Sequence, residues 1–362
     1  MQDAEMPPHL ANDTCRDYKY DTSLTDEQIQ TIADWVEAGT PEGDPSVDPE
    51  PLPSASPELS EVDLRLGVPK PYKPRRSPDD YRCFPIDWPA DEKKFVTGFG
   101  VDPDEREIAH HAIAYVLGPS LSDEVDQKAA SEEGPGYTCF GGTKVGDLYP
   151  QGAVRWLGAW APGNRGSDLP EGTGIPVKPG STVVLQMHYN TLTADPRLDE
   201  TEVLVNTDTS AETTGQYFPF TNPKWLQNED AMKIPAGAPD VTHEWTFDVA
   251  SYLGEPIKIH RAMLHMHKLG EAGRLWVDHS EGSEECLLGI SNWDFDWQRT
   301  YSFQKPVSIQ PGDEVGIQCT WDNTLSNQPV FNGQRQQPRD VSWGQGTTDE
   351  MCLGIFYVTL GK

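Results

Sequence analysis

From about residue 62 to its end, the sequence is a succession of short β-prone runs separated by turn residues. Its 32 glycines and 32 prolines suit strands joined by turns better than long helices. After Gly39, only residues 121–130 suggest a helical turn. Two blocks, 60–205 and 206–362, each have the size of a β-sandwich. We therefore expect an all-β chain of two tandem β-sandwich domains, preceded by a short helical N-terminal segment.

The N-terminal segment, residues 1–45, has a different pattern. A helix is predicted from Leu24 to Gly39, where Thr25 is the N-cap, Gln28 completes a capping box and Gly39 ends the helix. The apolar stripe of the helix consists of Ile29, Ile32, Ala33 and Val36, and the N-terminal segment is expected to pack against its neighbour. Residues 46–59 are rich in Pro, Glu, Ser and Asp and are predicted to form a linker.

Charge and cysteine content limit the compartment and the partners. The formal charge of −30 is spread along the chain and repels nucleic acid and anionic membranes. No run reaches the length of a membrane span, and no signal peptide opens the sequence. The six cysteines are widely spaced and form no Cys-x-x-Cys pair. This spacing favours disulfides in a secreted or periplasmic protein over buried free thiols, and we take the sequence as a mature or trimmed form.

Five of the nine histidines lie in apolar, strand-like runs. His265 and His267 are two residues apart on a predicted strand, so their side chains project from the same face. His110 and His111 are adjacent and would face opposite ways on a regular strand. Both reach one metal only at a bulge, at a strand end or through different ring nitrogens. His188 is the single histidine of a third strand-like run.

Each of these histidines taken singly is also compatible with an ordinary core residue. Met351 stands at the start of the last predicted strand, where a methionine is usually core filler. His260 opens the strand of His265 and is expected to be a satisfied structural histidine. We expect the other three histidines, His9, His243 and His279, to be exposed to solvent.

The motifs together are more specific than any one of them. His110-His111, then Gln186-x-His188-Tyr189, then His265-x-His267-x-x-Gly270, then Asp349-Glu350-Met351-Cys352 resemble the copper type II, ascorbate-dependent monooxygenases. The resemblance covers about residues 60–362 and implies two jelly-roll-like domains with one copper each. It implies an electron-transfer copper on His110, His111 and His188. The catalytic copper, which activates oxygen, would be held by His265, His267 and Met351.

The ligand types agree with this expectation. Imidazole accepts both copper oxidation states, and the methionine thioether favours Cu(I). Three protein ligands leave an open position, as a catalytic site requires. The resemblance also implies a disulfide between Cys319 and Cys352 and another between Cys83 and Cys139. Cys15 and Cys286 either pair with each other, which would dock the N-terminal segment, or stay free.

The N-terminal segment resembles the C-terminal end of a cytochrome c-like module. Met6-Pro7-Pro8 stands where such modules carry a distal methionine, but the haem-attachment motif is absent, which argues against bound haem. We therefore interpret the segment as a remnant of such a module. An electron-donor protein remains one possible partner.

The substrate-holding positions differ from those of the peptide-hydroxylating relatives. Where those enzymes carry an arginine, an asparagine and a tyrosine, this chain has Met263, Leu353 and Ile355. A peptide carboxylate has no cationic fork to bind at these places, so a small neutral or hydrophobic substrate is expected. Aromatic residues of 155–160 and 293–298 would either wall its pocket or lie in the core.

The predicted function is that of a two-copper monooxygenase that hydroxylates a C–H bond with O2 and an external reductant, such as ascorbate or a redox protein. The alternative is a secreted or periplasmic copper-binding or docking protein on the same scaffold without turnover. The apolar substitutions leave this alternative open, whereas the retention of all six ligand positions weighs against it.

Overall fold

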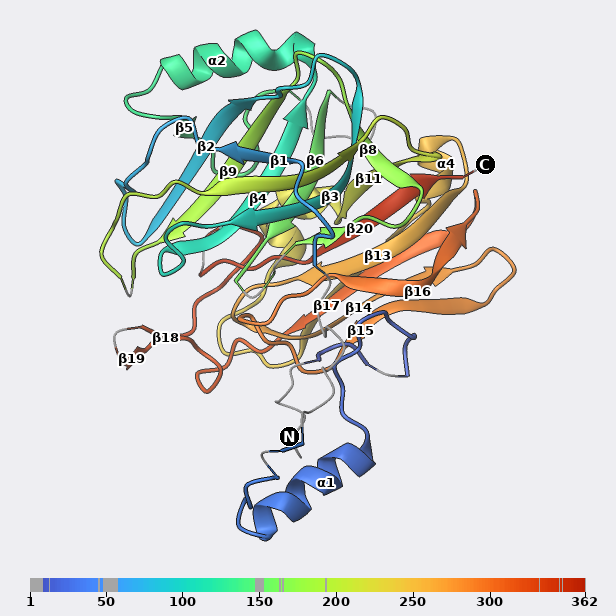
Figure 1. Cartoon of the computed structure of the whole chain (residues 1–362). Helices are drawn as coiled ribbons and strands as arrows, with labels where there is room; N and C mark the ends of the chain where they lie inside the picture. The colour runs from blue at the N-terminus through green and yellow to red at the C-terminus, as the bar shows by residue number, and fades with distance from the viewer. Residues whose placement is uncertain are drawn as a thin grey trace.

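The computed structural model describes residues 9–12, 14–44, 46–47, 58–146, 153–162, 164, 166–192, 194–331, 333–344, 346 and 348–361. Within them the chain is mainly β, so the predicted fold class is confirmed. The strands of the first half lie above those of the second half in Figure 1. Met6-Pro7-Pro8, proposed as the haem-module remnant's methionine position, lies outside the described residues.

Two sheets form the first half. The sheet that carries the first histidines has the order β5-β2-β9-β4-β6, with bounds β2 (Asp79–Asp87), β4 (Ala109–Leu117), β5 (Tyr137–Thr138), β6 (Val154–Trp160) and β9 (Thr182–Asn190). The facing strands are β1 (Leu64–Gly67), β3 (Lys94–Asp102), β7 (Ser167–Asp168), β8 (Thr173–Val177) and β10 (Glu202–Asp208). Apolar residues of both sheets share a buried core.

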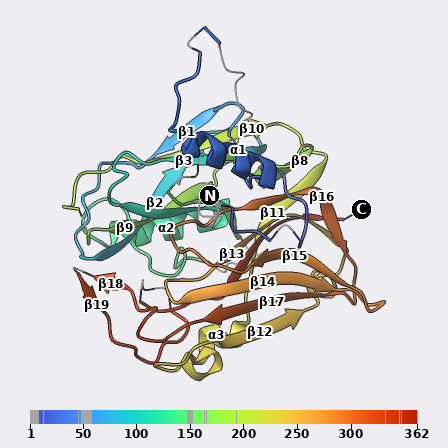
Figure 2. The same ribbon diagram turned by 90° about the horizontal axis from the view of Figure 1, so that it is seen from below.

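Two further groups of strands form the second half. The group with the order β11-β20-β13-β16 has the bounds β11 (Thr213–Phe220), β13 (Ile257–His265), β16 (Tyr301–Ile309) and β20 (Leu353–Leu360). The other sheet has the order β12-β17-β14-β15, with bounds β12 (Val241–Phe247), β14 (Gly270–Asp278), β15 (Glu284–Ile290) and β17 (Glu314–Trp321). Figure 2 shows these four strands side by side. A small ribbon of β18 (Val330–Phe331) and β19 (Gln334–Arg335) completes the strands.

The two halves are joined into one continuous sheet. β8 and β11 pair in parallel, Thr213 with Thr173 and Thr214 with Gly174. The Tyr357 hydroxyl of β20 lies 2.9 Å from the Thr173 hydroxyl. A side chain at Gly215 would collide with that tyrosine, so the glycine is what allows the close crossing. The division at residue 205 stays a prediction, and the strand that spans it, β10, ends at Asp208.

The helices are few and short. α1 (Asp26–Glu37) has the predicted capping box between Thr25 and Gln28, and Gly39 follows with φ of 83°. The others are α2 (Ser122–Ala130), α3 (Pro223–Gln227), α4 (Val249–Leu253) and the 3-10 turns η1 (Pro119–Leu121) and η2 (Glu229–Met232). No helix among the described residues is long and apolar enough to cross a membrane.

The N-terminal segment packs against the second half, as expected, but not through α1. No residue of α1 is buried, and the helix stands apart from the sheets (Figure 1). The docking is done instead by the preceding arm, here the described residues of 9–20. Ala11 and Tyr18 of the arm are buried and form β-bridges to Ile290 and Phe303. Backbone pairing and burial of two side chains hold the arm, whereas the apolar stripe of α1 is at most half-buried.

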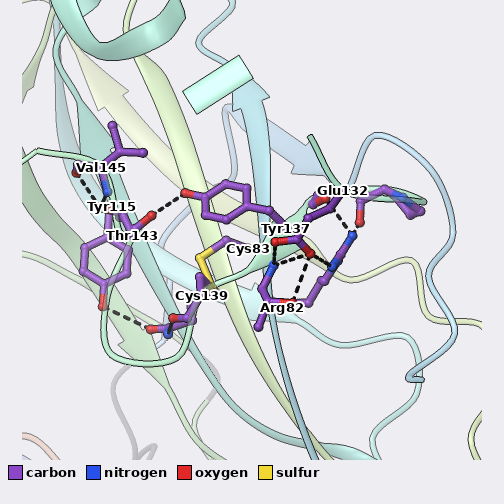
Figure 3. Close-up of a disulfide and its surroundings, with 12 residues drawn as sticks. Arg82, Cys83, Tyr115, Glu132, Tyr137, Cys139, Thr143 and Val145 are labelled. Atoms are coloured by element: carbon purple, nitrogen blue, oxygen red, sulfur yellow. Dashed lines mark hydrogen bonds and ion pairs between the residues drawn. A yellow bond between two sulfur atoms is a disulfide. The ribbon is translucent and has the colours of Figure 1, made fainter. Parts of the chain in front are cut away.

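Three disulfides are present, and no described cysteine is free. The two pairs implied by the family resemblance, Cys83–Cys139 and Cys319–Cys352, are both confirmed. Of the two alternatives for the remaining cysteines, pairing is correct, because Cys15–Cys286 joins the arm to β15. Figure 3 shows the bond that ties β2 to the segment after β5.

Candidate metal centres

A first cluster brings together the predicted histidines of β4 and β9. The register pairs His111 with His188 and shifts by one residue between Ala109 and His111. Such a bulge lets two neighbouring side chains lie on one face of the sheet, which is one of the arrangements that the adjacent histidines require. The Nδ1 atom of His111 lies 3.2 Å from Nδ1 of His110 and 3.3 Å from Nδ1 of His188. Three lone-pair nitrogens thus converge on one point, as a three-coordinate metal requires.

The outer nitrogen of His188 is held by a carboxylate. His188 Nε2–H donates to Asp79 Oδ1 at 2.8 Å, and the same oxygen accepts from Asn190 Nδ2 at 2.9 Å. This bond places the proton on Nε2 and leaves Nδ1 as the ligand atom. The ring of Tyr81 stacks on that of His188 at 4.1 Å. Orientation and tautomer of His188 are therefore fixed by its neighbours on β2 and β9.

A second cluster lies where β13 ends and β20 begins. The antiparallel register pairs His265 with Leu353. His267 follows this pair by two residues on the β13 side, and Met351 precedes it by two residues on the β20 side. The ring centroids of His265 and His267 lie 5.1 Å apart, and Met351 is buried. Strand pairing therefore brings the end of β13, with His265 and His267, next to the start of β20, which Met351 precedes in the sequence.

Hydrogen bonds fix the tautomers in this second cluster too. His265 Nδ1–H donates to Gln298 Oε1 at 2.5 Å, and His267 Nδ1–H donates to the Asp349 carbonyl at 2.9 Å. The Gln298 amide nitrogen donates to the Phe295 carbonyl at 2.9 Å, which fixes the oxygen of Gln298 toward His265. Both Nε2 atoms are thereby left as acceptors, as metal ligation requires.

Burial keeps the clustered imidazoles neutral. Burial, together with a smaller contribution from neighbouring histidines, lowers the pKa of His110 to about 4 and the pKa of His267 to about 3. The pKa values of His111 and His265 are lowered by burial as well. Neutral imidazole is the form that binds a metal ion. At neutral pH these donor sets can therefore accept a metal without first losing a proton.

Comparison with known proteins agrees with the donor sets. Residues 226–360 match the copper type II ascorbate-dependent monooxygenase, C-terminal domain, family. This match places the second half of the chain with the C-terminal domain of the copper monooxygenases. It is 24% identical over 330 residues to DBH-like monooxygenase protein 1 of Gallus gallus, covering 85% of this chain and 48% of the relative. It is 21% identical over 204 residues to MOXD1 homolog 1 of Drosophila melanogaster, covering 54% of this chain and 27% of the relative.

The chain thus spans about half the length of the first of these relatives and less of the second. Among solved structures, a peptide-N(4)-(N-acetyl-β-D-glucosaminyl) asparagine amidase matches with a TM-score of 0.33 and 9% identity. That match covers 82% of this chain and 96% of the amidase. A score this low supports no conclusion about the copper monooxygenase fold or function.

One aromatic ring lies close to both histidine clusters. The Phe295 ring lies 5.7 Å from that of His110 and 6.2 Å from that of His267. The Lys268 ammonium stands over the same ring at 4.3 Å. A neighbouring aromatic, Trp293, donates its indole N–H to the His267 carbonyl at 3.0 Å. The segment 293–298 therefore lies at the candidate centres, whereas Trp156 and Trp160 of the other aromatic stretch are buried core residues.

Glu350 is a site residue to which the sequence analysis gave no role. It is fully buried and accepts hydrogen bonds from the His267 N–H at 2.9 Å, the Leu269 N–H at 2.7 Å and the Trp321 indole at 2.9 Å. Because Glu350 directly precedes Met351, these hydrogen bonds hold the start of the Met351 segment against the residues that follow β13. The sequence gave no signal for this role, because a glutamate between a turn and a strand is usually exposed to solvent.

The predicted apolar lining lies between the halves. Met263 pairs with Ile355, and Ile355 belongs to a buried cluster of mainly first-half residues, such as Tyr115, against which Met263 and Leu353 also pack. These side chains belong to a hydrophobic cluster that also contains the Cys83–Cys139 disulfide. The three apolar residues that replace the substrate-holding residues of the peptide-hydroxylating relatives therefore face the first half.

The expectation of solvent exposure is wrong for two of the three histidines, His9 and His279. The His9 side chain is 4% exposed and packs edge-on to Tyr301 at 5.6 Å. His279 lies between Asp313 and Glu285, and these carboxylates raise its pKa despite partial burial. His243 is half-buried and contacts the Lys233 carbonyl. His260, as expected, is a satisfied histidine, with Nε2 2.8 Å from the Thr359 hydroxyl.

Proposed function

We propose that the chain is a copper monooxygenase that hydroxylates a C–H bond of a small, neutral or hydrophobic substrate. One oxygen atom of O2 would enter the C–H bond and the other would leave as water, with two electrons and two protons from an external reductant such as ascorbate. The observation that carries this proposal is the pair of donor sets within a chain whose second half matches the copper monooxygenase family.

The residues present fit copper, one ion in each cluster. His110, His111 and His188 would hold one ion through Nδ1. His265 and His267 would hold the other through Nε2, together with the Met351 thioether. When bound, copper supplies the one-electron redox chemistry that C–H hydroxylation with O2 needs. The soft thioether favours the reduced ion, and the absence of a carboxylate ligand disfavours magnesium or calcium.

The chain's own residues would orient the substrate, exclude water from the site and set the protonation of the ligand histidines. Asp79 and the Asp349 carbonyl hold protons on the outer ring nitrogens, so the ligand nitrogens stay available. The lining of Met263, Leu353 and Ile355 offers no charge or hydrogen-bond donor, which supports an uncharged substrate. Substrate orientation against the second cluster would then depend on shape.

The setting that we propose is secreted or periplasmic. Three disulfides support an oxidising compartment. A small-molecule substrate, O2 and a reductant are the proposed partners, and an electron-donor protein is the other possible source of electrons. No role with nucleic acid or membrane is proposed, given the charge of −30.

The deciding experiment measures copper per chain and X-ray absorption of the Cu(I) form, in the wild type and in Met351→Ile. We expect two coppers per wild-type chain and one sulfur scatterer that the variant lacks. Ascorbate-dependent oxygen consumption should disappear in the variant, while copper at the three-histidine cluster stays bound. Full activity of Met351→Ile would contradict the assignment. Copper uptake with no reductant-dependent oxygen consumption, across a broad substrate screen, would favour the copper-binding protein without turnover.

A further inference from the structure

A cavity of about 170 Å³ lies where the arm meets the seam between the two halves. We call it the seam cavity. Its walls come from Lys19 and Tyr20 of the arm, from residues 168–171 after β7, and from β13 and β16. Arg261 and Ser302 line it and are buried, whereas Lys19 is exposed at its rim. It is separate from both histidine clusters, none of whose residues line it.

Arg261 lines this cavity with an unbalanced charge. The side chain is only 7% exposed. Its Nη1 donates to the Ser167 hydroxyl at 3.0 Å, its Nη2 donates to the Asp168 carbonyl, and the guanidinium also hydrogen-bonds to the Tyr217 hydroxyl. No described carboxylate lies within ion-pair distance, and Nε has no hydrogen-bond partner among the described residues. A buried cation is normally paired, because an uncompensated charge is costly to desolvate.

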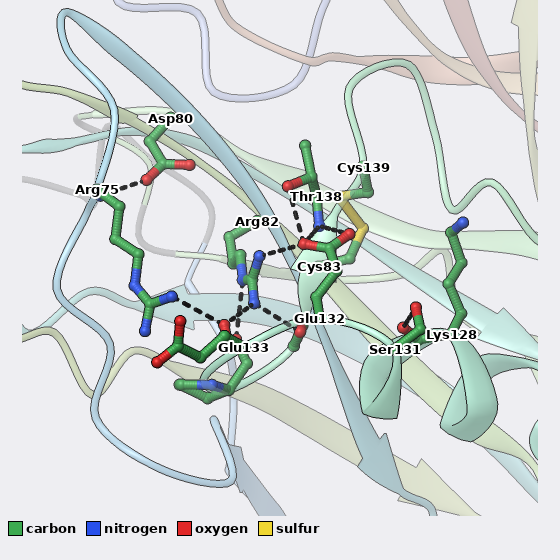
Figure 4. Close-up of polar contacts among 12 residues, drawn as sticks. Arg75, Asp80, Arg82, Cys83, Lys128, Ser131, Glu132, Glu133, Thr138 and Cys139 are labelled. Atoms are coloured by element: carbon green, nitrogen blue, oxygen red, sulfur yellow. Dashed lines mark hydrogen bonds and ion pairs between the residues drawn. A yellow bond between two sulfur atoms is a disulfide. The ribbon is translucent and has the colours of Figure 1, made fainter.

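Another buried arginine of the chain shows what a purely structural role looks like. Arg82 is 4% exposed and forms an ion pair with Glu132 at 2.7 Å. It also donates to the carbonyls of Glu133, Pro135 and Gly136 (Figure 4). Its charge and its donors are therefore balanced within the protein. Arg261 has neither the carboxylate nor the full set of acceptors, although it is buried nearly as deeply.

The acidic residues around the cavity do not supply the missing charge. The Asp168 carboxylate accepts from the Ser60 N–H and the Asn206 amide and is held by them. Glu58 and Glu171 are exposed residues at the rim. Exposed carboxylates are screened by solvent and contribute little to a buried cation. They would nevertheless repel a ligand with several negative charges, so the site favours a small anion with one charge.

We propose that the seam cavity binds a small monocarboxylate, with the Arg261 guanidinium as the charged partner. A carboxylate accepts from a planar guanidinium with well-matched geometry, and Arg261 is the buried cation that lines this cavity. The Ser302 side chain and the Lys19 ammonium line the same cavity as further polar partners. This inference does not rest on the proposed copper chemistry, because no metal ligand takes part in it.

The test is a titration of the copper-free full chain with trifluoroacetate, followed by 19F NMR at constant ionic strength. Trifluoroethanol, a neutral molecule of similar size, is the ligand control. We expect saturable binding of trifluoroacetate only, weakened at least about tenfold in Arg261→Gln. Arg65→Gln, which removes an exposed arginine of β1 and changes the net charge equally, should bind as the wild type does.

Two outcomes would overturn the proposal: no saturable binding to the wild type, or an affinity of Arg261→Gln within about twofold of the wild type. If Arg261→Gln does not fold, Arg261→Lys takes its place, because it keeps the charge and loses the fork. The lysine variant should bind trifluoroacetate several-fold more weakly, and equal binding would count against the site. Copper stoichiometry plays no part in either readout, so failure here leaves the proposed function untouched.

Discussion

The carboxylate of Asp79 should control metal affinity at the first cluster without touching the metal. It accepts a 2.8 Å hydrogen bond from His188 Nε2, and His188 is only 2% exposed. Replacing Asp79 by Ala removes the group that fixes the ligand tautomer and ring orientation. Loss of such a partner typically lowers metal affinity about 10–100-fold, equivalent to about 1.4–2.7 kcal/mol. We expect a loss of this size at the three-histidine cluster, and little change at the cluster of His265 and His267.

The neighbouring residue provides a matched control. Asp80 follows directly on the same strand, but its carboxylate accepts from the Tyr72 hydroxyl at 2.8 Å and the Arg75 N–H at 2.6 Å, away from the histidines. Asp80→Ala should lower stability and leave copper affinity unchanged. Competition with a copper chelator gives the affinities, and electron paramagnetic resonance of Cu(II) separates the two centres. Equal copper affinity in Asp79→Ala and wild type, or an equal loss in both variants, would refute the reasoning.

Three further perturbations test other parts of the fold. Glu350→Ala leaves three buried donors without an acceptor and should lower the free energy of unfolding by about 3 kcal/mol, measured by urea denaturation. Removing the Cys15–Cys286 bond by a double alanine replacement should speed proteolysis of the arm and leave the melting temperature of the sheets nearly unchanged. The raised pKa of His279 means that its stabilising effect is full below its unfolded pKa and is lost as pH rises through the folded pKa. His279→Gln should remove that part of the pH dependence, and parallel unfolding profiles of variant and wild type would contradict it.

The sequence predicted what depends on local pattern and on residue order. The all-β architecture and the capping box of α1 follow from periodicity and turn chemistry, and both are present. The three histidine motifs and Met351 were singled out as ligands through their joint order, and their ligand roles stay a prediction. For the adjacent pair His110 and His111, the sequence required an irregular strand, and the structure has a bulge there.

What the sequence could not predict depends on contacts between distant segments. His9 and His279 stand in polar stretches, yet their partners lie about 290 and 30 residues away in Tyr301 and Asp313. The amphipathic pattern of α1 did not reveal that the helix buries no residue and that the preceding arm does the packing. Glu350 has no local signal, because its role exists only once β13 and β20 lie side by side.

Strand pairing and side-chain contacts join the two halves that carry the histidine clusters. β8 pairs with β11, the Thr173 and Tyr357 hydroxyls meet at 2.9 Å, and Arg261 reaches across to Ser167 at 3.0 Å. Separating the halves would break these bonds and expose the apolar cluster behind Met263. The arm adds a disulfide and two β-bridges on the same side as the seam cavity. The continuous sheet therefore ties the two halves together and carries the second cluster at the end of β13, while the first cluster lies on the separate sheet of β4 and β9.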